Sequence, residues 1–252
     1  MPPTAPLRLV RDDFSATPEL DTAVSRALLL RASNGEIGET FRLHTPGNVV
    51  AFGKRDTLEP GYGDAVEISR RNGFAPIERL AGGRAAVFTQ STLAFAWTIP
   101  DEDPRSHIYD RFRTLADVVV DAFRRLGVAS SIGEIRGEYC PGDYSVNHAG
   151  QIKLMGVGQR LARHAAHVGG VIVVDDSAGL RDILTDIYTA LGLAWEPATA
   201  GALTDVDPTI TMEAAAAAIV AELATRRATV PASIDRETVA LASTLTEDHV
   251  PS

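Results

Sequence analysis

Residues 150–160 read Gly-Gln-Ile-Lys-Leu-Met-Gly-Val-Gly-Gln-Arg, and residues 79–85 read Arg-Leu-Ala-Gly-Gly-Arg-Ala. Each segment combines basic side chains with glycines, which let a ligand approach the main chain closely. A phosphate or carboxylate bound against the main chain needs this combination, because cations and backbone N–H groups both stabilise its charge. The two segments together predict one anion-binding site built from distant parts of the chain.

The sequence around these segments predicts an α+β fold. Apolar residues recur at helical spacing in 20–30, 64–72, 108–126, 180–191, 212–227 and 235–247, and β-rich runs occupy 41–44, 48–53, 76–79, 92–99, 144–147, 152–155 and 169–174. Pro46-Gly47 predicts a hairpin-like turn between the first two strands, and His148-Ala-Gly150-Gln predicts a tight turn within an antiparallel meander. We expect a mixed, largely antiparallel central sheet flanked by helices.

Composition divides the chain into unequal parts. Residues 196–210 are rich in Pro, Ala, Thr, Gly and Asp, which is typical of a linker. We therefore expect a main domain over 1–195, the linker, and a short helical C-terminal segment over 211–252. That last segment has too few large apolar residues to fold alone.

Charge and cysteine content exclude several classes of function. The chain has 252 residues, is 45% hydrophobic, and carries a formal net charge of −9, which disfavours nucleic acid and anionic lipid as partners. A single cysteine fits a reducing compartment. The amino terminus, Met-Pro-Pro-Thr-Ala-Pro, has no signal-peptide pattern, and no apolar run approaches the ~20 residues of a membrane span. We expect a cytoplasmic protein without membrane contact.

The motifs identify a family. Arg79-x-x-Gly82-Gly83-Arg84-Ala85, then Gly142-Asp143-Tyr144, then Lys153-x-x-Gly156-x-Gly-Gln-Arg resemble the lipoate-protein ligase A and octanoyltransferase family over roughly residues 20 to 190. The resemblance implies the biotin/lipoate ligase catalytic fold, which is like that of class II synthetases, for the domain 1–195. It also implies attachment of a lipoyl or octanoyl group to a lysine on the lipoyl carrier domain of a 2-oxoacid dehydrogenase or glycine-cleavage protein.

The resemblance assigns roles to single residues. Lys153 would polarise the carboxyl oxygen and contact the bridging phosphate, as a fixed cation beside a developing oxyanion. Asp143 would orient Lys153 or help to hold ribose or magnesium. The residues expected to bind substrate or nucleotide are Arg79, Gly82, Gly83, Arg84, Ala85, Asp143, Gly156 and Gln159. The strand segments 49–52, 93–97 and 171–173 are expected to line an apolar tunnel for the acyl chain.

No metal site is expected from the sequence. His107, His148, His164 and His167 lack metal-ligand spacing with the cysteine.

Cys140 decides between the possible reactions. It precedes Lys153 by thirteen positions in the turn-prone run Gly137-Glu-Tyr-Cys140-Pro-Gly-Asp143, and it resembles the nucleophile of octanoyltransferases. A small, half-buried structural side chain is the alternative role for this cysteine. A thiolate nucleophile would instead form a thioester with the acyl group, with Lys153 lowering the thiol pKa.

Three functions remain open at this point. The first choice is a lipoate-protein ligase that uses ATP and Mg²⁺ through an acyl-adenylate. The second is an ATP-independent octanoyltransferase that uses Cys140, needs no cofactor and takes the acyl group from an acyl carrier protein. The third is a non-catalytic lipoyl-binding protein, which is favoured by Phe88 and Ala81, because relatives often carry histidine and serine at these positions.

Overall fold

A computed structural model of the chain describes residues 5–251. Residues 1–4 and 252 lie outside it, so the expectation of no signal peptide concerns a stretch that falls mostly outside the described residues. No helix within 5–251 combines the length and apolar character needed to cross a bilayer.

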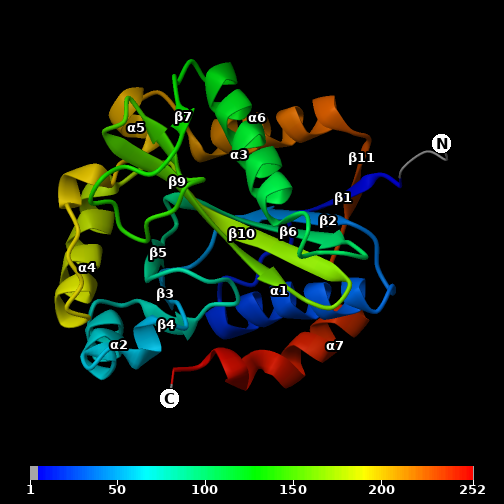
Figure 1. Cartoon of the computed structure of the whole chain (residues 1–252), viewed down its shortest axis with the longest axis horizontal. Coiled ribbons are helices and arrows are strands. Elements are labelled where there is room, and N and C mark those ends of the chain that lie inside the picture. Colours follow the sequence, from blue (N-terminus) through cyan, green and yellow to red (C-terminus); the bar gives the residue numbers. More distant parts are fainter. Residues whose placement is uncertain (1–4, 252) are drawn as a thin grey trace.

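A large sheet forms the centre of the fold (Figure 1). Within the described residues its strands are, in spatial order, β11 (Thr229–Ala232), β1 (Leu7–Val10), β2 (Thr40–His44), β6 (Thr92–Pro100), β10 (Ala165–Val173), β9 (Ile152–Leu161), β8 (Val146–His148) and β7 (Ser131–Ile132). From β2 to β7 all neighbours pair antiparallel, whereas β1 pairs parallel with both β11 and β2. The predicted mixed, largely antiparallel sheet is confirmed.

Helices cover both faces of the large sheet (Figure 1). The helices α3 (Ile108–Arg125) and α6 (Met212–Arg226) pack with the sheet around the largest apolar cluster of the described residues. The other face carries α1 (Pro18–Ser33), against which α7 (Arg236–Leu245) and the short 3₁₀ helix η3 (Thr246–His249) pack.

A smaller sheet lies beside the large one. It consists of β4 (Ala75–Glu78), β3 (Val49–Phe52) and β5 (Ala86–Phe88), with β3 in the middle. Its apolar cluster includes side chains of α2 (Tyr62–Arg71) and α4 (Ser177–Ala190). The short helix η1 (Asp56–Leu58) connects β3 to α2.

The predicted hairpin around Pro46-Gly47 is wrong. The strand before it, β2, pairs with β1 and β6 in the large sheet, whereas β3 pairs with β4 and β5 in the small one. The physical reason is a close approach of main chains: an ideal Cβ at Gly47 would lie 2.8 Å from the main-chain oxygen of Ser15. The Pro-Gly pair therefore directs the chain from one sheet to the other, past the start of α1.

The carboxyl-terminal residues are in contact with the rest of the chain. The stretch 196–210 contains η2 (Pro197–Thr199) and α5 (Leu203–Val206), and its Ala200 forms an isolated bridge with Lys153 of β9. Beyond it, β11 extends the large sheet. Division of the chain into two domains and a linker stays a prediction.

Small residues beneath α1 make room between helix and sheet. Ala96 of β6 is paired with Gly169 of β10, which is paired with Gly158 of β9. Since residues in register lie on the same face of a sheet, this row presents only a methyl group or less toward α1. A space therefore remains between α1 and this part of the sheet.

Candidate functional site

The two glycine segments meet in the folded chain. An ideal Cβ at Gly158 would lie 3.0 Å from the main-chain oxygen of Gly82 and 3.1 Å from Cβ of Ala81. On the other side of the same loop, an ideal Cβ at Gly53 would overlap the main-chain oxygen of Gly83. Only residues without a side chain permit such approaches. The convergence predicted for the segments 79–85 and 150–160 is therefore found in the structure.

Cys140 lies at this junction. Its Sγ is 3.2 Å from Nη2 of Arg79 and 3.3 Å from the main-chain nitrogen of Arg84. Its backbone adopts φ = 42°, in the left-handed region that non-glycine residues rarely occupy. The main-chain N–H of Cys140 donates to the Tyr188 hydroxyl over 2.7 Å, which helps to hold this strained conformation. The strained backbone and the hydrogen bond to Tyr188 together fix the position of the Cys140 sulfur.

The surroundings of Cys140 favour the thiolate. Burial opposes ionisation of the thiol, but the charges of Arg79 and Lys153 and the hydrogen bonds from Arg79 and the Arg84 N–H outweigh it. Together they hold the pKa of Cys140 below its usual value. A cysteine with a lowered pKa and partial exposure has the character of a nucleophile rather than of an inert core residue.

Lys153 is buried and fully hydrogen-bonded. Its side chain is 1% exposed, and Nζ donates to Oε1 of Glu138 over 2.9 Å, to the main-chain oxygen of Tyr139 over 2.9 Å and to that of Cys140 over 2.8 Å. An ammonium has three N–H donors, and these three acceptors use them all. Lys153 therefore fixes the loop that carries Cys140 and contributes positive charge, with no donor left over for a substrate.

Glu138 is a site residue that the sequence reading missed. Its carboxylate accepts from Lys153, from the hydroxyl of Ser145 over 2.6 Å, and from the main-chain nitrogens of Gly142 over 3.2 Å and Ile135 over 3.0 Å. A buried carboxylate is tolerated when it is paired and hydrogen-bonded in this way. The signal was present in the chain as an acidic residue two positions before the cysteine.

Arg79 connects the thiol to the turn at Gly83. Its Nη2 donates to the main-chain oxygen of Arg84 over 2.6 Å as well as to Cys140, while its buried Nε has no hydrogen-bond partner among residues 5–251. Gly83 has φ = 109°, and an ideal Cβ there would overlap Nη2 of Arg79 and lie 2.8 Å from the sulfur. The guanidinium thus connects the thiol to the main chain of the turn.

Arg84 and Ala85 serve the site through their main chains. The Arg84 guanidinium turns away to Glu59 over 2.7 Å and Asp56 over 3.3 Å, leaving its N–H on the sulfur. The oxygen of Ala85 accepts from the Tyr188 hydroxyl over 3.1 Å. Tyr188 was not singled out from the sequence, because it belongs to the apolar stripe of α4 and nothing local distinguishes it.

Three other predicted residues have different surroundings. Gly156 makes room for Lys153, since an ideal Cβ there would lie 3.2 Å from Cε of the lysine. Gln159 packs toward α3, where its Oε1 accepts from Nε of Arg111 over 2.7 Å. Asp143 is exposed, and the carboxylate that orients Lys153 is that of Glu138. Assignment of Gln159 and Asp143 to substrate or nucleotide stays a prediction.

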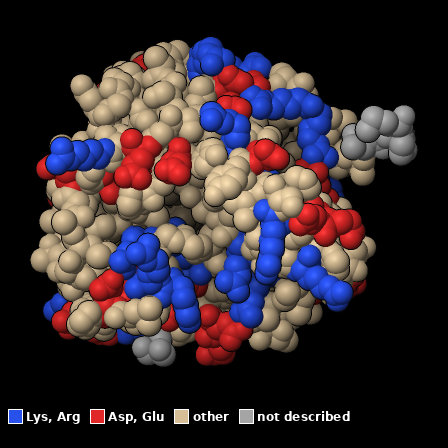
Figure 2. All heavy atoms as spheres, in the orientation of Figure 1, with Lys and Arg blue, Asp and Glu red and all other residues tan. Residues whose placement is uncertain are grey.

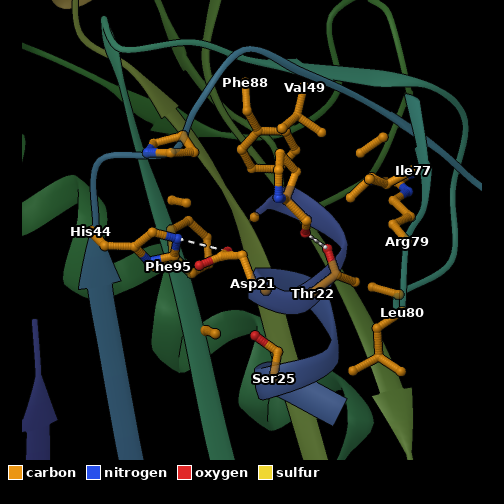
Figure 3. Close-up of a pocket in the computed structure, with 18 of the residues that line it drawn as sticks. Asp21, Thr22, Ser25, His44, Val49, Ile77, Arg79, Leu80, Phe88 and Phe95 are labelled. Atoms are coloured by element: carbon orange, nitrogen blue, oxygen red, sulfur yellow. Dashed lines mark hydrogen bonds and ion pairs between the residues drawn. The ribbon is translucent and has the colours of Figure 1, made fainter. Parts of the chain in front are cut away.

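A pocket opens beside Arg79, in the space under α1 (Figure 3). Its cavity volume is about 110 Å³, and it opens to solvent at its mouth. One wall is apolar and the other polar, with Val49, Ile77, Leu80 and Phe88 on the first and Asp21, Thr22, Ser25 and His44 on the second (Figure 3). Arg79 therefore borders both the thiol and a partly apolar cavity.

Two of the three strand segments predicted to line an acyl tunnel border this pocket. Val49 and Ala51 of β3 and Ala94, Phe95 and Ala96 of β6 line the pocket. From β10 the lining residues are His167, Gly169 and Gly170 instead of 171–173. The side chains of Val171 and Val173 are buried, and the glycines create the free space.

Basic side chains border a hollow on the face seen in Figure 2. Lys and Arg gather below and to the right of the hollow, although the whole chain has a formal charge of −9. The local electrostatic field on this face therefore differs in sign from the net charge of the chain, and it favours anionic groups there. Among residues 5–251, no group of three or more His, Cys, Asp or Glu side chains is arranged to hold a metal ion.

Comparisons with known proteins agree with this geometry. The model of the family "Lipoyl protein ligase A/B catalytic domain" matches residues 17–224. An octanoyl-[GcvH]:protein N-octanoyltransferase of Geobacillus kaustophilus is 28% identical over 188 residues, which are 75% of this chain and 66% of that protein. A lipoyl-[GcvH]:protein N-lipoyltransferase of Listeria monocytogenes is 25% identical over 64% of this chain and 57% of its own length. The matched region thus spans about two thirds or less of these relatives.

A solved structure shares the fold. A lipoate-protein ligase A bound with ATP superposes with a TM-score of 0.79 at 18% identity, over 96% of this chain and 95% of that one. The similarity extends over nearly the whole chain, so the carboxyl-terminal elements belong to the shared architecture. The ligase-like fold expected from the motifs is confirmed.

Proposed function

The chain belongs to the lipoyl protein ligase A/B catalytic domain family, and we propose that it transfers a lipoyl or octanoyl group to a lysine of a lipoyl carrier domain, with Cys140 as the intermediate acyl carrier. The observation that carries this proposal is the placement of the Cys140 sulfur between the Arg84 N–H and Arg79, a residue that also lines the pocket under α1. The names of the two relatives indicate GcvH as the protein that carries the acyl group.

The first half of the reaction forms a thioester on the enzyme. The Cys140 thiolate attacks the carbonyl carbon of the donor's acyl group, and the carbon–sulfur bond forms. The bond from that carbon to the donor's leaving atom breaks. The leaving group, an amine or a thiol, departs with the proton that the cysteine lost. Atoms therefore balance for a carrier-bound acyl-lysine and for an acyl thioester.

The carbonyl oxygen becomes negative in the tetrahedral state and needs donors. Lys153 has none free, because Glu138, Tyr139 and Cys140 accept all three of its N–H groups. The Arg79 guanidinium lies beside the sulfur and borders the pocket, which places its positive charge near that oxygen. We therefore assign oxyanion stabilisation to Arg79 and the main chain of the Gly83 turn, and assign to Lys153 the positioning of Cys140.

The second half reverses the first. The neutral ε-amine of an acceptor lysine attacks the thioester carbon, an amide forms, and the sulfur leaves as the stabilised thiolate while the amine loses its extra proton to solvent. The low pKa of Cys140 serves both halves, because it provides the nucleophile first and a good leaving group afterwards.

ATP-dependent ligation is the second candidate. The similarity to the ATP-bound ligase over nearly the whole chain favours it as a fold. In that reaction ATP and Mg²⁺ would be required, and the exposed Asp143 would supply a carboxylate to a magnesium ion held mainly by phosphates. A non-catalytic binding protein, the third alternative, gives no reason for a strained cysteine with a lowered pKa.

One assay separates these functions. The protein is incubated with a lipoyl-domain acceptor and, in parallel, with octanoyl-GcvH, with octanoyl-acyl carrier protein, or with octanoate plus ATP and magnesium, and the acceptor is weighed by mass spectrometry. We expect ATP-independent acylation of the acceptor that Cys140→Ser abolishes. Acylation only from free acid plus ATP, unaffected by Cys140→Ser, would instead establish the ligase.

A further inference from the structure

Two large apolar side chains stand in water near the Gly82-Gly83 turn. Leu58, the last residue of η1, is 81% exposed, and Tyr109, the second residue of α3, is 71% exposed. Both glycines of the turn are exposed as well, and the N–H that follows them contacts the Cys140 sulfur. Single exposed apolar side chains are ordinary on a protein, so their meaning depends on what surrounds them.

Leu58 is connected to the thiol through short contacts. The side chain of its neighbour Glu59 holds the Arg84 guanidinium over 2.7 Å, and the Arg84 N–H contacts the Cys140 sulfur over 3.3 Å. The same guanidinium donates to the main-chain oxygen of Arg55 over 3.4 Å. The segment 54–59 therefore forms one border of the site.

Tyr109 lies at a second border. The main-chain oxygen of its neighbour Ile108 accepts from Nε2 of Gln159 over 3.2 Å. Gly158, the residue before Gln159, approaches Gly82 so closely that an ideal Cβ would lie 3.0 Å from the main-chain oxygen of that glycine. The start of α3 therefore borders the turn at Gly82, and η1 borders it at the residue that follows the turn.

The segment that carries Leu58 also has an excess of positive charge. Lys54 and Arg55 are exposed, and neither forms an ion pair within residues 5–251. The two carboxylates of the segment, Asp56 and Glu59, are both held by Arg84. Because the whole chain has a formal charge of −9, it repels an acidic protein at long range, and local positive charge is needed where such a partner docks.

The proposed reaction decides what must cover this surface. A protein that delivers an acyl group to Cys140 has to bring its acylated lysine to the sulfur. A protein–protein interface of standard size covers roughly 800 Å² on each partner. Leu58 and Tyr109 each lie within a few contacts of the sulfur, so an interface centred on the thiol includes both.

We propose that Leu58 and Tyr109, together with Lys54 and Arg55, form the docking surface for the acyl carrier domain, and that the face of this domain around its modified lysine is partly apolar and acidic. The inference rests on the proposed function and deepens it by naming where the partner binds. The donor and the acceptor dock here in turn, because the described chain has one cysteine to serve both halves of the reaction.

Removal of the two apolar side chains tests the surface. In Leu58→Ser/Tyr109→Ser we expect KM for octanoyl-GcvH to rise about tenfold. Alkylation of Cys140 by iodoacetamide, which needs no docking, should stay within about twofold of the wild-type rate and shows that the variant is folded. Leu30→Ser, at a side chain that is 36% exposed on α1, is the matched control and should leave both quantities unchanged.

Reversal of the two charges tests the acidic partner. We expect KM of the wild-type chain for octanoyl-GcvH to rise as sodium chloride is added, because salt screens exposed charges. Lys54→Glu/Arg55→Glu should have a KM about tenfold higher at low salt and lose this dependence. Arg236→Glu, at an exposed first residue of α7, is the matched control and should behave like the wild type. A wild-type KM that salt does not change would overturn the acidic character of the partner.

Binding without catalysis separates this inference from the proposed function. Unacylated GcvH is titrated calorimetrically into the wild-type chain and into both double variants. Binding that the variants weaken, with no acyl transfer in any assay, would refute the proposed function and support the docking surface. Acyl transfer by both double variants at the wild-type KM would refute the docking surface and leave the function in place.

Discussion

The Lys153 ammonium donates a hydrogen bond to the main-chain oxygen of Cys140 over 2.8 Å, inside the protein. The amine that the motif resemblance assigns to catalysis therefore holds the backbone of Cys140. Glu138 completes the unit by accepting from the same ammonium over 2.9 Å. The site thus combines a buried ion pair with a more accessible sulfur.

Breaking the buried ion pair should unfold the chain more readily. Lys153→Met leaves Glu138, whose side chain is 0% exposed, without its counter-charge, and we expect a loss of about 3–5 kcal/mol in the free energy of unfolding. The double variant Lys153→Met/Glu138→Gln should recover most of that loss but not the transfer activity. Urea denaturation of both variants and of Glu138→Gln completes a double-mutant cycle for the free energy of unfolding. If the losses of the two single variants simply add up in the double variant, Lys153 and Glu138 are not coupled.

Removing the Arg79 charge should raise the thiol pKa. Because Arg79 is the largest of the charge effects that favour the thiolate, Arg79→Gln should move the midpoint of Cys140 alkylation to higher pH. Cys140 is the chain's only cysteine, so iodoacetamide reports on it alone. Arg79→Lys, which keeps the charge, should shift the midpoint less. An unchanged midpoint in Arg79→Gln would show that the guanidinium does not support the thiolate.

The two adjacent glycines should respond differently to the same change. Gly83→Ala puts a methyl group onto Arg79 and near the Cys140 sulfur at a residue with φ = 109°, and we expect acyl transfer to fall at least tenfold. Gly82→Ala is the matched control, because an ideal Cβ there meets nothing within 4 Å. Steady-state rates of acyl transfer by both variants measure this difference. Similar losses of rate in the two variants would contradict the prediction.

Acid should destabilise the chain through His167. Burial lowers the pKa of this histidine to about 4, whereas an unfolded histidine titrates near 6.5. Between these values the unfolded chain binds the proton and the folded chain does not, so stability is present above about pH 6.5 and falls as pH drops toward 4. The loss attributable to His167 is about 3 kcal/mol.

Denaturation curves from pH 7 to pH 4.5 measure this slope. In His167→Phe the part that comes from this residue should vanish, whereas the exposed His107→Phe should keep it. A wild-type slope that His167→Phe leaves intact would assign the acid sensitivity to other groups.

The sequence predicts which segments form the site better than it predicts the hydrogen-bond partners within it. Glycines and basic residues in two ordered segments predict that 79–85 and 150–160 meet, because that combination has few structural uses. The partners of Lys153 do not follow from the sequence, since Glu138 and Asp143 are both acidic residues of the same loop and only the fold buries one and exposes the other. Tyr188 and His44 are further cases, because each acts across the fold from the residue it contacts.

The pairing of strands also cannot be predicted from the local sequence pattern alone. Pro46-Gly47 between two β-rich runs has the appearance of a hairpin turn, and the approach of Gly47 to Ser15 that sends β3 into the small sheet is a contact across 32 positions. The largely antiparallel meander of β8, β9 and β10 was predicted correctly, because its turns are short and local.

The most direct measurement is of the thioester itself. The chain is mixed with octanoyl-GcvH without acceptor or nucleotide, quenched in acid, and weighed intact before and after treatment with hydroxylamine. We predict one octanoyl group per chain, removed by hydroxylamine, located on the peptide that contains Cys140, and absent in Cys140→Ser. Full transfer to an acceptor by Cys140→Ser, or no acyl adduct on the wild-type cysteine during turnover, would contradict the account.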